Sequence, residues 1–463
     1  MTTRQAAQTT ELAALQARMR DELTGRLAVH LPRLNWDADQ LSAHQAERLR
    51  TLLGHAAEHS PFHKRRLAGI DPASFDPADL RRLPAMSKAE MMAGFDDVVT
   101  DRRLDRRQVE DHLLRSRHEP SLLLGEYVCL ASGGSSGLRG IFVQTIGEYC
   151  DHLASVVRRV AAWHLASGAP GGLVGALVAA AAPVHSTGFA GALLRGYPAE
   201  FMPVPVALPL AEAVERLNAL RLAILVGYPS RLVQLAAEHA ARRLNISPLI
   251  VISIAETLTG ADRQLITDGF GVPVINTFAA TEGLVGTTDP GGTELTFAGD
   301  MCIAEPVDAA GNPVPAGMPS AKVLVTNLHN FSQPLIRYEL NDSFTACRDT
   351  TRRGHHLRAE VNGRDDAAFR YGGVAIHPLA IRTVMTTCGA VSEYQVRQSK
   401  CGVTISVVVT GELDEDELAA SLAVSLSKAG LHDPDVAVQV VESVERHPET
   451  GKARRFIPLG TDG

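Results

Sequence analysis

Six consecutive small residues, 132–137, lie between two apolar runs in the segment YVCLASGGSSGLRGIFVQT, residues 127–145. The turn mixes serines with glycines, and two kinds of chemistry use that mixture. Residues 133–137 match G-x-S-x-G, the elbow that presents a nucleophilic serine, so that Ser135 would attack an ester. Alternatively, glycines let backbone N–H groups approach an anion closely, and serine hydroxyls add further donors. On that interpretation the turn is a phosphate cradle.

The surrounding sequence favours the phosphate cradle. A nucleophile elbow needs a strand followed at once by a helix, whereas here a second strand-like run, GIFVQT, follows the turn. The helix is predicted to begin only near Thr145, which forms a T-x-x-E capping box with Glu148. A Walker loop is excluded because Leu138 and Arg139 stand where a lysine is required. The serine hydrolase remains the distant alternative.

The elements that must position this turn are of three kinds. The first hundred residues show apolar residues at helical spacing. Strand-like and amphipathic segments then alternate between residues 172 and 279, which predicts a largely parallel sheet covered by helices. Short strands and turns follow over about 290–362 as a β-rich subdomain. We therefore predict an α/β fold with a large domain over 1–365 and a small, mobile α+β domain over 366–463.

Further motifs follow in a fixed order: FAATEG (278–283), PLIRYELND (334–342), GRDDAAFRYGGVAIHP (363–378) and ETGKARRF (449–456). With the serine-rich turn, they resemble the adenylate-forming superfamily, the acyl-CoA synthetases and their relatives, and above all its phenylacetate–CoA ligase-like branch. The resemblance covers nearly the whole chain. It implies that a carboxylate is activated with ATP to an acyl-adenylate, with release of pyrophosphate.

The resemblance assigns roles to residues of these motifs. The serine-rich turn would hold the β- and γ-phosphates of ATP. Its binding residues would be Ser132, Gly134, Ser135, Ser136 and Gly137. This sequence departs from the family pattern at Gly133, Arg139 and Gly140, which affects how the phosphates are gripped.

The segment FAATEG would contribute to both the base and the phosphates. Phe278 takes the position of an aromatic residue that lies against the adenine, and Thr281 that of a threonine that contacts phosphate. Glu282 resembles the acidic ligand of Mg²⁺, a hard oxygen donor suited to that ion. Without its neighbours, a Thr-Glu pair would more simply begin a helix. Ala255, Glu256 and Asn276 are the other predicted adenine-pocket residues.

Further motif residues would bind the ribose, form the hinge of the carboxy-terminal domain and supply its lysine. Asp342 corresponds to the aspartate that accepts hydrogen bonds from the ribose hydroxyls, and Arg364 to a second ribose contact. Taken alone, the two would more simply be a surface ion pair. Asp366 corresponds to the hinge of the carboxy-terminal domain. Lys452 matches the lysine that bridges the attacking carboxylate and the α-phosphate, a task suited to a flexible point charge.

The sequence identifies the acid substrate and the acceptor of the acyl group less closely. By order along the chain, the acid pocket draws on 183–194 and 226–230, with the candidates His185, Ser186, Gly188, Phe189 and Tyr228. A small, aromatic carboxylic acid is the expected substrate, and His185 could equally be a buried core histidine. The acceptor would be the thiol of coenzyme A or of a carrier protein's phosphopantetheine, with Gly373 beside the thiol tunnel. Alternatives are transfer to an amine, activation of another oxyanion such as nitrite in specialised metabolism, and a catalytically silent adenylate-binding protein.

Composition limits the partners. A net charge of −7 in 463 residues disfavours nucleic acid, and the longest apolar stretch, 171–184, is too short to span a bilayer. The six cysteines are scattered without metal-ligand spacing, which disfavours zinc and is typical of thiols in a reducing cytoplasm. We therefore expect a cytoplasmic protein without membrane or nucleic-acid partners. The oligomeric state stays open, a homodimer included.

Overall fold

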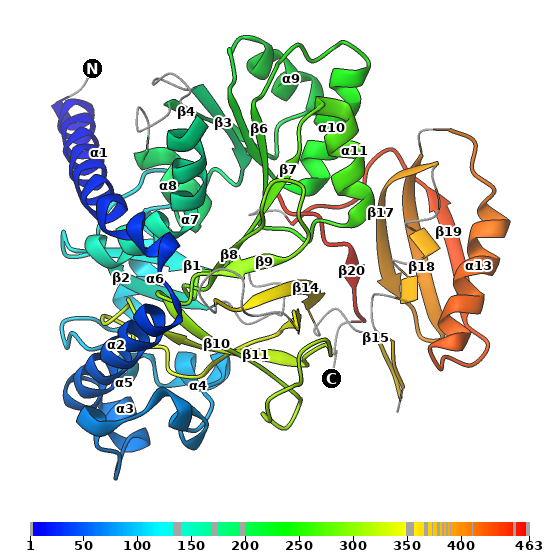
Figure 1. The fold of residues 1–463 in the computed structure, drawn as a ribbon. Helices are drawn as coiled ribbons and strands as arrows, with labels where there is room; N and C mark the ends of the chain where they lie inside the picture. Colours follow the sequence, from blue (N-terminus) through cyan, green and yellow to red (C-terminus); the bar gives the residue numbers. More distant parts are fainter. Residues whose placement is uncertain are drawn as a thin grey trace.

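A computed structural model gives the arrangement of the chain (Figure 1). It describes residues 3–132, 140–167, 174–194, 200–348, 356–364, 369–372, 374–376, 380–381, 384–385, 388, 390–409, 411–447 and 451–459. The α/β fold expected from the sequence is confirmed, with a large mixed sheet, covering helices and a small carboxy-terminal unit. Among the described residues, no helix combines the length and apolar character needed to cross a membrane.

The amino-terminal hundred residues are helical, as predicted. Their helices begin at capping residues: the Asp37 carboxylate accepts from the Gln40 N–H, and Ser87 and Glu90 form a capping box. The helices are α1 (Thr3–His30), α2 (Ala38–His59), α3 (Pro61–Arg66), α4 (Lys88–Ala93), α5 (Phe95–Val98) and α6 (Arg106–Arg115).

The serine-rich turn joins β1 (Tyr127–Ala131) and β2 (Ile141–Thr145), which pair antiparallel. Helix α7 (Ile146–Ser167) starts directly after β2. The predicted capping box is present, because Thr145 N–H donates to the Glu148 carboxylate at 2.7 Å and Glu148 N–H donates to the Thr145 hydroxyl at 3.2 Å. The order of strand, turn, strand and helix is thus confirmed.

Parallel strands form one half of a nine-stranded sheet, in the order β7-β6-β5-β3-β4. They are β3 (Val174–Ala179), β4 (Glu200–Pro205), β5 (Ile224–Gly227), β6 (Ile250–Ile254) and β7 (Val274–Ala279). The helices between them are α8 (Ser186–Leu193), α9 (Leu210–Asn218), α10 (Pro229–Ala240) and α11 (Gly260–Phe270). Helices α9, α10 and α11 lie within segments whose periodicity predicted them, whereas α8 was not predicted as a helix.

Antiparallel strands form the other half of this sheet. Strands β8 (Val285–Thr287), β9 (Leu295–Phe297), β13 (Asp342–Ala346) and β14 (Arg358–Arg364) extend it from β7 in the order β7-β8-β9-β14-β13. A separate three-stranded sheet holds β10 (Cys302–Val307), β11 (Lys322–Asn327) and β12 (Tyr338–Leu340). The β-rich stretch predicted near 290–362 is therefore divided between the large sheet and this smaller one.

The carboxy-terminal unit, residues 369–459, has its own core. Its four-stranded sheet has the order β19-β18-β17-β20, and α13 lies on the face of that sheet away from the rest of the molecule (Figure 1). Ile405 and Leu422 are fully buried between sheet and helix. The elements are β15 (Phe369–Tyr371), β16 (Val374–Ile376), β17 (Val391–Gln398), β18 (Gly402–Val409), α13 (Glu415–Lys428), β19 (Asp435–Val440) and β20 (Phe456–Ile457).

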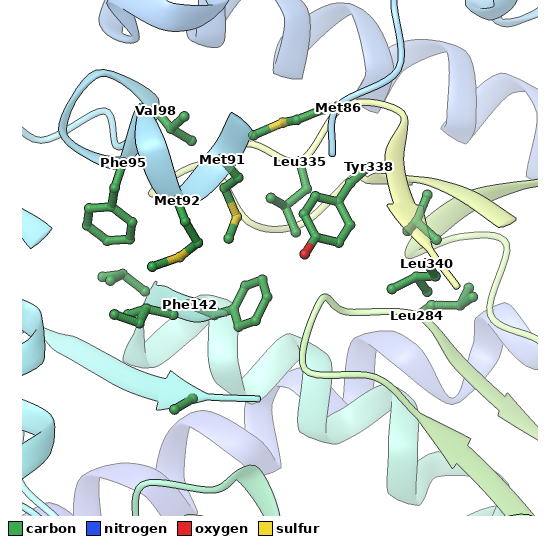
Figure 2. Packing of buried hydrophobic residues seen from close by; sticks show 14 of the residues in the cluster. Met86, Met91, Met92, Phe95, Val98, Phe142, Leu284, Leu335, Tyr338 and Leu340 are labelled. Carbon is green, nitrogen blue, oxygen red and sulfur yellow. The ribbon is translucent and has the colours of Figure 1, made fainter. Parts of the chain in front are cut away.

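The main core joins the amino-terminal helices to the β1–β2 hairpin. Figure 2 shows Met91 and Met92 of α4 facing Phe142 of β2. Phe142 also meets the Tyr338 ring edge-on at 6.4 Å between centroids. Because flexible methionines fill gaps between rigid rings, this packing fixes the hairpin, and with it both ends of the serine-rich turn, against the large unit.

Candidate active site

Three predicted site residues follow the ends of neighbouring parallel strands. Tyr228 follows β5, Ala255 follows β6, and Phe278 lies near the end of β7. Registers pair Gly227 with Ser253 across β5 and β6. Because the carboxyl ends of parallel strands share one edge, loops after these strands meet in one crevice, where α/β proteins bind ligands. The structure therefore gathers residues that are up to fifty positions apart in sequence.

The serine-rich turn opens beside this edge. Ser132 closes the mouth of the turn, because its hydroxyl accepts from Gly140 N–H at 2.8 Å and its own N–H donates to the Gly140 carbonyl at 2.9 Å. Ala131 N–H donates to the Val184 carbonyl at 2.9 Å, which places the turn next to the loop after β3. The predicted phosphate residues Gly134, Ser135, Ser136 and Gly137 lie outside the described residues.

The hairpin bears on the hydrolase alternative. A serine nucleophile elbow runs from a strand directly into a helix. Here the chain leaves β1 and returns antiparallel as β2, with Ala131 opposite Ile141, and the helix begins only at Ile146. The described residues on either side of the turn therefore form a strand-to-strand connection, which differs from that of a nucleophile elbow.

Thr281 and Glu282 lie in a tight turn between β7 and β8. Ala280 N–H donates to the Leu284 carbonyl and Gly283 N–H to the Ala280 carbonyl, each at 2.9 Å. The turn leads into β8, so the simpler interpretation of Thr-Glu as a helix start is wrong. Gly283 has φ of +107°, and a Cβ atom there would lie 2.2 Å from the Asn327 side-chain nitrogen. Only glycine fits this position.

A run of three buried amides holds this turn and the hairpin, and the sequence analysis missed it. Asn327 donates to the Glu282 carbonyl at 2.8 Å, and Asn330 donates to the Val143 carbonyl at 3.1 Å. Gln333 accepts from Val143 N–H at 2.8 Å. All three side chains are at most 2% exposed. We name Asn327, Asn330 and Gln333 the amide ladder; their regular spacing of three was the available signal.

Phe278 contacts the antiparallel half of the sheet. Its ring meets Phe344 of β13 edge-on, with centroids 5.5 Å apart, and Phe297 at 5.9 Å. The residue is only half-buried, so part of it stays accessible. Asp342 begins β13 and is buried, and the register places it directly opposite Arg364 at the end of β14. The two predicted ribose contacts are thus brought together.

The loop after β6 departs from ordinary backbone geometry. Ala255 has φ of +66°, in the left-handed region that costs a non-glycine residue roughly 1–3 kcal/mol. The next residue, Glu256, accepts a hydrogen bond from Ser230 N–H at 3.2 Å and another from Ala453 N–H at 2.7 Å. Asn276, on the adjacent strand β7, donates its N–H to the Thr288 hydroxyl, and its carbonyl accepts from Thr288 N–H, each at 2.9 Å. Strain at Ala255 therefore positions a carboxylate between the two units.

The predicted acid-pocket residues do not all face one space. Phe189 lies in the core under α8, where its ring meets Tyr149 edge-on at 5.3 Å. A Cβ at Gly188 would collide with the Ala182 carbonyl at 2.2 Å, so α8 packs tightly on the preceding loop. The Ser186 carbonyl accepts a hydrogen bond from the Tyr149 hydroxyl. These three residues hold α8 in place.

His185 and Tyr228 lie at the loop after β3. The Tyr228 hydroxyl accepts from Ala180 N–H at 3.1 Å, and burial raises the pKa of Tyr228 to about 12. His185 is buried, with Nδ1 3.2 Å from the Ala131 carbonyl. A cavity of about 350 Å³ opens here, lined by residues 181–185 together with Arg117 and His118, which the sequence analysis did not select.

Lys452 lies in the segment that precedes β20, and this segment contacts the large unit. Its carbonyl accepts from His447 N–H at 2.9 Å, and its neighbour Ala453 is bound by Glu256. Gly451 has φ of +65°, and a Cβ atom there would lie 2.3 Å from the Val206 side chain. Lys452 itself is half-buried. The predicted hinge Asp366 and the predicted tunnel residue Gly373 lie outside the described residues.

Glu282 is the residue predicted to bind a metal ion. Among the described residues, no group of three or more His, Cys, Asp or Glu side chains could hold one. Magnesium is commonly held by one or two carboxylates together with substrate phosphates. The buried Glu282 beside Thr281 fits that pattern. The donor set therefore suits Mg²⁺ bound with a nucleotide and does not form a complete protein cage.

Similarity to other proteins agrees with this geometry. No protein-family model matches the chain. The indoleacetate–lysine synthetase of Pseudomonas savastanoi is 30% identical over 217 residues, or 44% of this chain and 50% of that protein, so the match spans about half the length of this relative. The phenylacetate–coenzyme A ligase of Thermus thermophilus is 27% identical over 414 residues, or 83% of this chain and 82% of that protein.

Solved structures of one enzyme, 2-hydroxyisobutyryl-CoA ligase, show the same fold. In the postadenylation state with 2-HIB-AMP, that enzyme superposes with a TM-score of 0.70 at 19% identity, covering 92% of this chain and 91% of the other. In the thioesterification state with 2-HIB-AMP and CoA, the coverage and identity are the same but the TM-score is 0.56. The chain is therefore similar in sequence to a phenylacetate–coenzyme A ligase over most of its length, and similar in fold to a CoA ligase whose solved structures hold an acyl-adenylate.

Proposed function

We propose that this protein activates a small aromatic carboxylic acid with ATP as the acyl-adenylate and transfers the acyl group to a thiol. The observation that carries the proposal is the hydrogen bond from Ala453 N–H to the Glu256 carboxylate, which joins residues 197 positions apart. It brings the segment of Lys452, the only lysine in its motif, to the edge where the other motif residues end. A cation at this place suits a reaction in which a carboxylate attacks a phosphate.

The reaction brings two anions together, so the site must offset charge as the bond to the α-phosphate forms. In our proposal the serine-rich turn and Thr281 hold the phosphates, and Glu282 holds Mg²⁺, which would supply positive charge beside them. Phe278 supports the adenine and Asp342 the ribose. Lys452 bridges the carboxylate and the α-phosphate. These assignments follow the superfamily resemblance residue by residue.

The acid is proposed to occupy the space after β3, near His185 and Tyr228. A cavity of about 350 Å³ is at the small end of ligand pockets, which favours a compact acid. Both sequence relatives are named for arylacetates, indoleacetate and phenylacetate. We therefore propose an aromatic acid whose carboxyl group is attached to the ring directly or through a short chain. The proposed acceptor is the thiol of coenzyme A or of pantetheine.

Lys452→Ala tests the proposed mechanism. We expect acid-dependent exchange of pyrophosphate into ATP to fall by about 100-fold or more, because the transition state loses its bridging cation. ATP affinity, measured by calorimetry, should change little. Lys428→Ala, on the exposed end of α13, is the matched control and should behave as wild type. An unchanged exchange rate in Lys452→Ala would contradict the mechanism, and labelling of Ser135 by a fluorophosphonate would favour the hydrolase.

An amine acceptor is the second candidate, because one relative is named as a lysine-joining synthetase. Mass spectrometry of reactions containing benzoic, phenylacetic or indoleacetic acids, with ATP and either coenzyme A or lysine, separates the two. A thioester with coenzyme A supports the first candidate. An amide formed without coenzyme A, and no thioester with it, supports the second.

A further inference from the structure

We infer that Glu256 is a positioning residue: by binding the backbone N–H of Ala453, it sets Lys452 over the crevice for adenylate formation. The inference rests on the proposed function and assigns Glu256 a role other than contact with the adenine. It makes this carboxylate the point where the large unit and the carboxy-terminal unit meet.

The carboxylate has one oxygen for each unit. Glu256 Oε2 accepts from Ser230 N–H of α10 at 3.2 Å, and Oε1 accepts from Ala453 N–H at 2.7 Å. Hydrogen bonds from backbone N–H to a charged carboxylate are short and about twice as strong as neutral ones. Ser230 is buried in the large unit. Glu256 is therefore anchored on one side and holds the lysine-bearing segment on the other.

The hydrogen bond from Ala453 N–H to Glu256 acts on Lys452 through the backbone. Ala453 follows Lys452 directly, so a fixed N–H at residue 453 fixes the peptide plane that carries the Lys452 carbonyl. That carbonyl is itself bound by His447 N–H at 2.9 Å. Gly451, on the other side, lies against Val206 so closely that no Cβ atom fits. The backbone of the lysine is thus held from both neighbours.

Other contacts across the interface support the same arrangement. Arg446 donates to the Ser230 hydroxyl at 3.0 Å and pairs with Glu393 of its own unit at 2.6 Å. Arg455 pairs with Asp262 of α11 at 2.8 Å. Both arginines are largely buried. Ser230 therefore receives one contact from Glu256 through its backbone and another from Arg446 through its side chain.

The overall arrangement of the units agrees with a role in the first half-reaction. The chain superposes better on the postadenylation state of 2-hydroxyisobutyryl-CoA ligase than on its thioesterification state, with TM-scores of 0.70 and 0.56 at equal identity and coverage. A rotation of the carboxy-terminal unit would separate Ala453 from Glu256. We therefore expect the Glu256 contact to matter for adenylate formation and to be absent during thiol transfer.

Glu256→Gln tests the inference with little change of shape. A glutamine has one acceptor oxygen, so it can keep one of the two backbone bonds and must present an N–H₂ group to the other donor. We expect kcat for acid-dependent pyrophosphate exchange to fall about 10- to 100-fold, because the lysine is misplaced, with KM for ATP changed less than about threefold. Thioester formation from supplied acyl-adenylate and coenzyme A should keep the wild-type rate.

Two further variants make the result specific. Arg446→Gln removes a contact to Ser230 that lies away from the nucleotide residues, and should also lower exchange without lowering thioester formation. Glu212→Gln, on the exposed face of α9 where Glu212 pairs with Arg216, should match wild type. A Glu256→Gln enzyme with raised KM for ATP and unchanged kcat would overturn the inference, because it would show a role in binding the base.

Amide hydrogen exchange separates this inference from the proposed function. In wild type without substrates, the peptide 451–459 should exchange slowly, and Glu256→Gln should speed it several-fold. If the wild-type protein catalyses no pyrophosphate exchange, the proposed function fails, whereas the exchange of this peptide still reports the contact. Equal exchange of the peptide in wild type and Glu256→Gln would overturn the positioning role whatever the activity.

Discussion

The two sides of the crevice are held by different interactions. On the side of the large unit, the amide ladder of Asn327, Asn330 and Gln333 binds the β2 backbone and the turn of Glu282 with neutral groups that are at most 2% exposed. On the side of the carboxy-terminal unit, the contacts are between charged groups, as in the largely buried pair of Arg455 and Asp262. One side is built into the core, and the other is laid against it.

This difference predicts which side can open. Breaking a neutral buried bond leaves donors and acceptors without water, at about 1–3 kcal/mol for each group. Charged groups at an interface regain water when they separate, so their parting costs little net free energy. We name the side of the large unit the floor and the side of the carboxy-terminal unit the cover. A fixed floor and a cover that can separate from it suit the proposed function, in which the site binds a nucleotide and then admits a second substrate. The difference also orders the tests below, from the largest effect to the smallest.

Gly283→Ala should damage the floor most. The new methyl group would meet the Asn327 side chain in a buried place, and the residue would also keep an unfavourable positive φ. We expect the free energy of unfolding in urea to fall by about 3–5 kcal/mol. Gly271→Ala is the matched control: it has φ of +69° but open space around its Cβ position, so about 1–2 kcal/mol is expected. Equal losses in both variants would show that the ladder does not hold the turn.

Acid should weaken the floor through two buried histidines. His329 lies within the ladder segment and stacks on His152, with ring centroids 6.1 Å apart. Burial lowers the pKa of His329 to about 3 and that of His152 to about 4. Both are therefore neutral in the native protein, whereas the unfolded chain takes up protons below about pH 6.5. Stability is complete above that pH and falls as pH decreases toward 4, by up to about 1.4 kcal/mol per pH unit for each histidine.

Urea unfolding between pH 7.5 and pH 5 measures this slope. His329→Gln should lower stability at pH 7.5 but reduce the slope, because one proton-binding group has been removed from the unfolded chain. A slope that is the same in wild type and variant would mean that other groups govern the acid response.

Salt should loosen the cover and leave the floor unchanged. Raising ionic strength from about 0.1 M to 1 M shortens the screening length from about 10 Å to 3 Å, which stabilises the charged groups of the interface once they have separated and regained water. We expect hydrogen exchange of residues 451–459 to rise a few-fold, with no change at residues 141–145. Asp262→Asn should reproduce part of the effect at low salt. Faster exchange of both peptides would contradict the distinction between the two sides.

Local patterns predicted most of the elements near the site. Strand β5 falls within the apolar run LAILVG, helix α11 coincides with GADRQLITDGF, and the capping box at Thr145 formed as expected. Such features depend on residues a few positions apart, so periodicity and capping reveal them. The order of the motifs was legible for the same reason.

Contacts between segments distant in sequence could not be predicted from the sequence. Nothing near Asn327 in sequence indicates that its amide binds the carbonyl of Glu282, and nothing near Glu256 indicates Ala453 as its partner. Likewise Phe189 was expected in the acid pocket by its place in the motif, whereas its ring lies in the core against Tyr149. The direction of a side chain depends on which face of its helix is covered, and that is a property of the packed molecule.

The sequence by itself determined the elements, their order and the residue types able to hold a nucleotide and a carboxylate. It did so because secondary structure and motif spacing are set by neighbours along the chain. The tertiary structure alone decided that a carboxylate at the end of β6 holds the backbone beside Lys452. That contact depends on how two separately packed units meet, and the free energy of such a meeting is distributed over residues that share no pattern in the sequence.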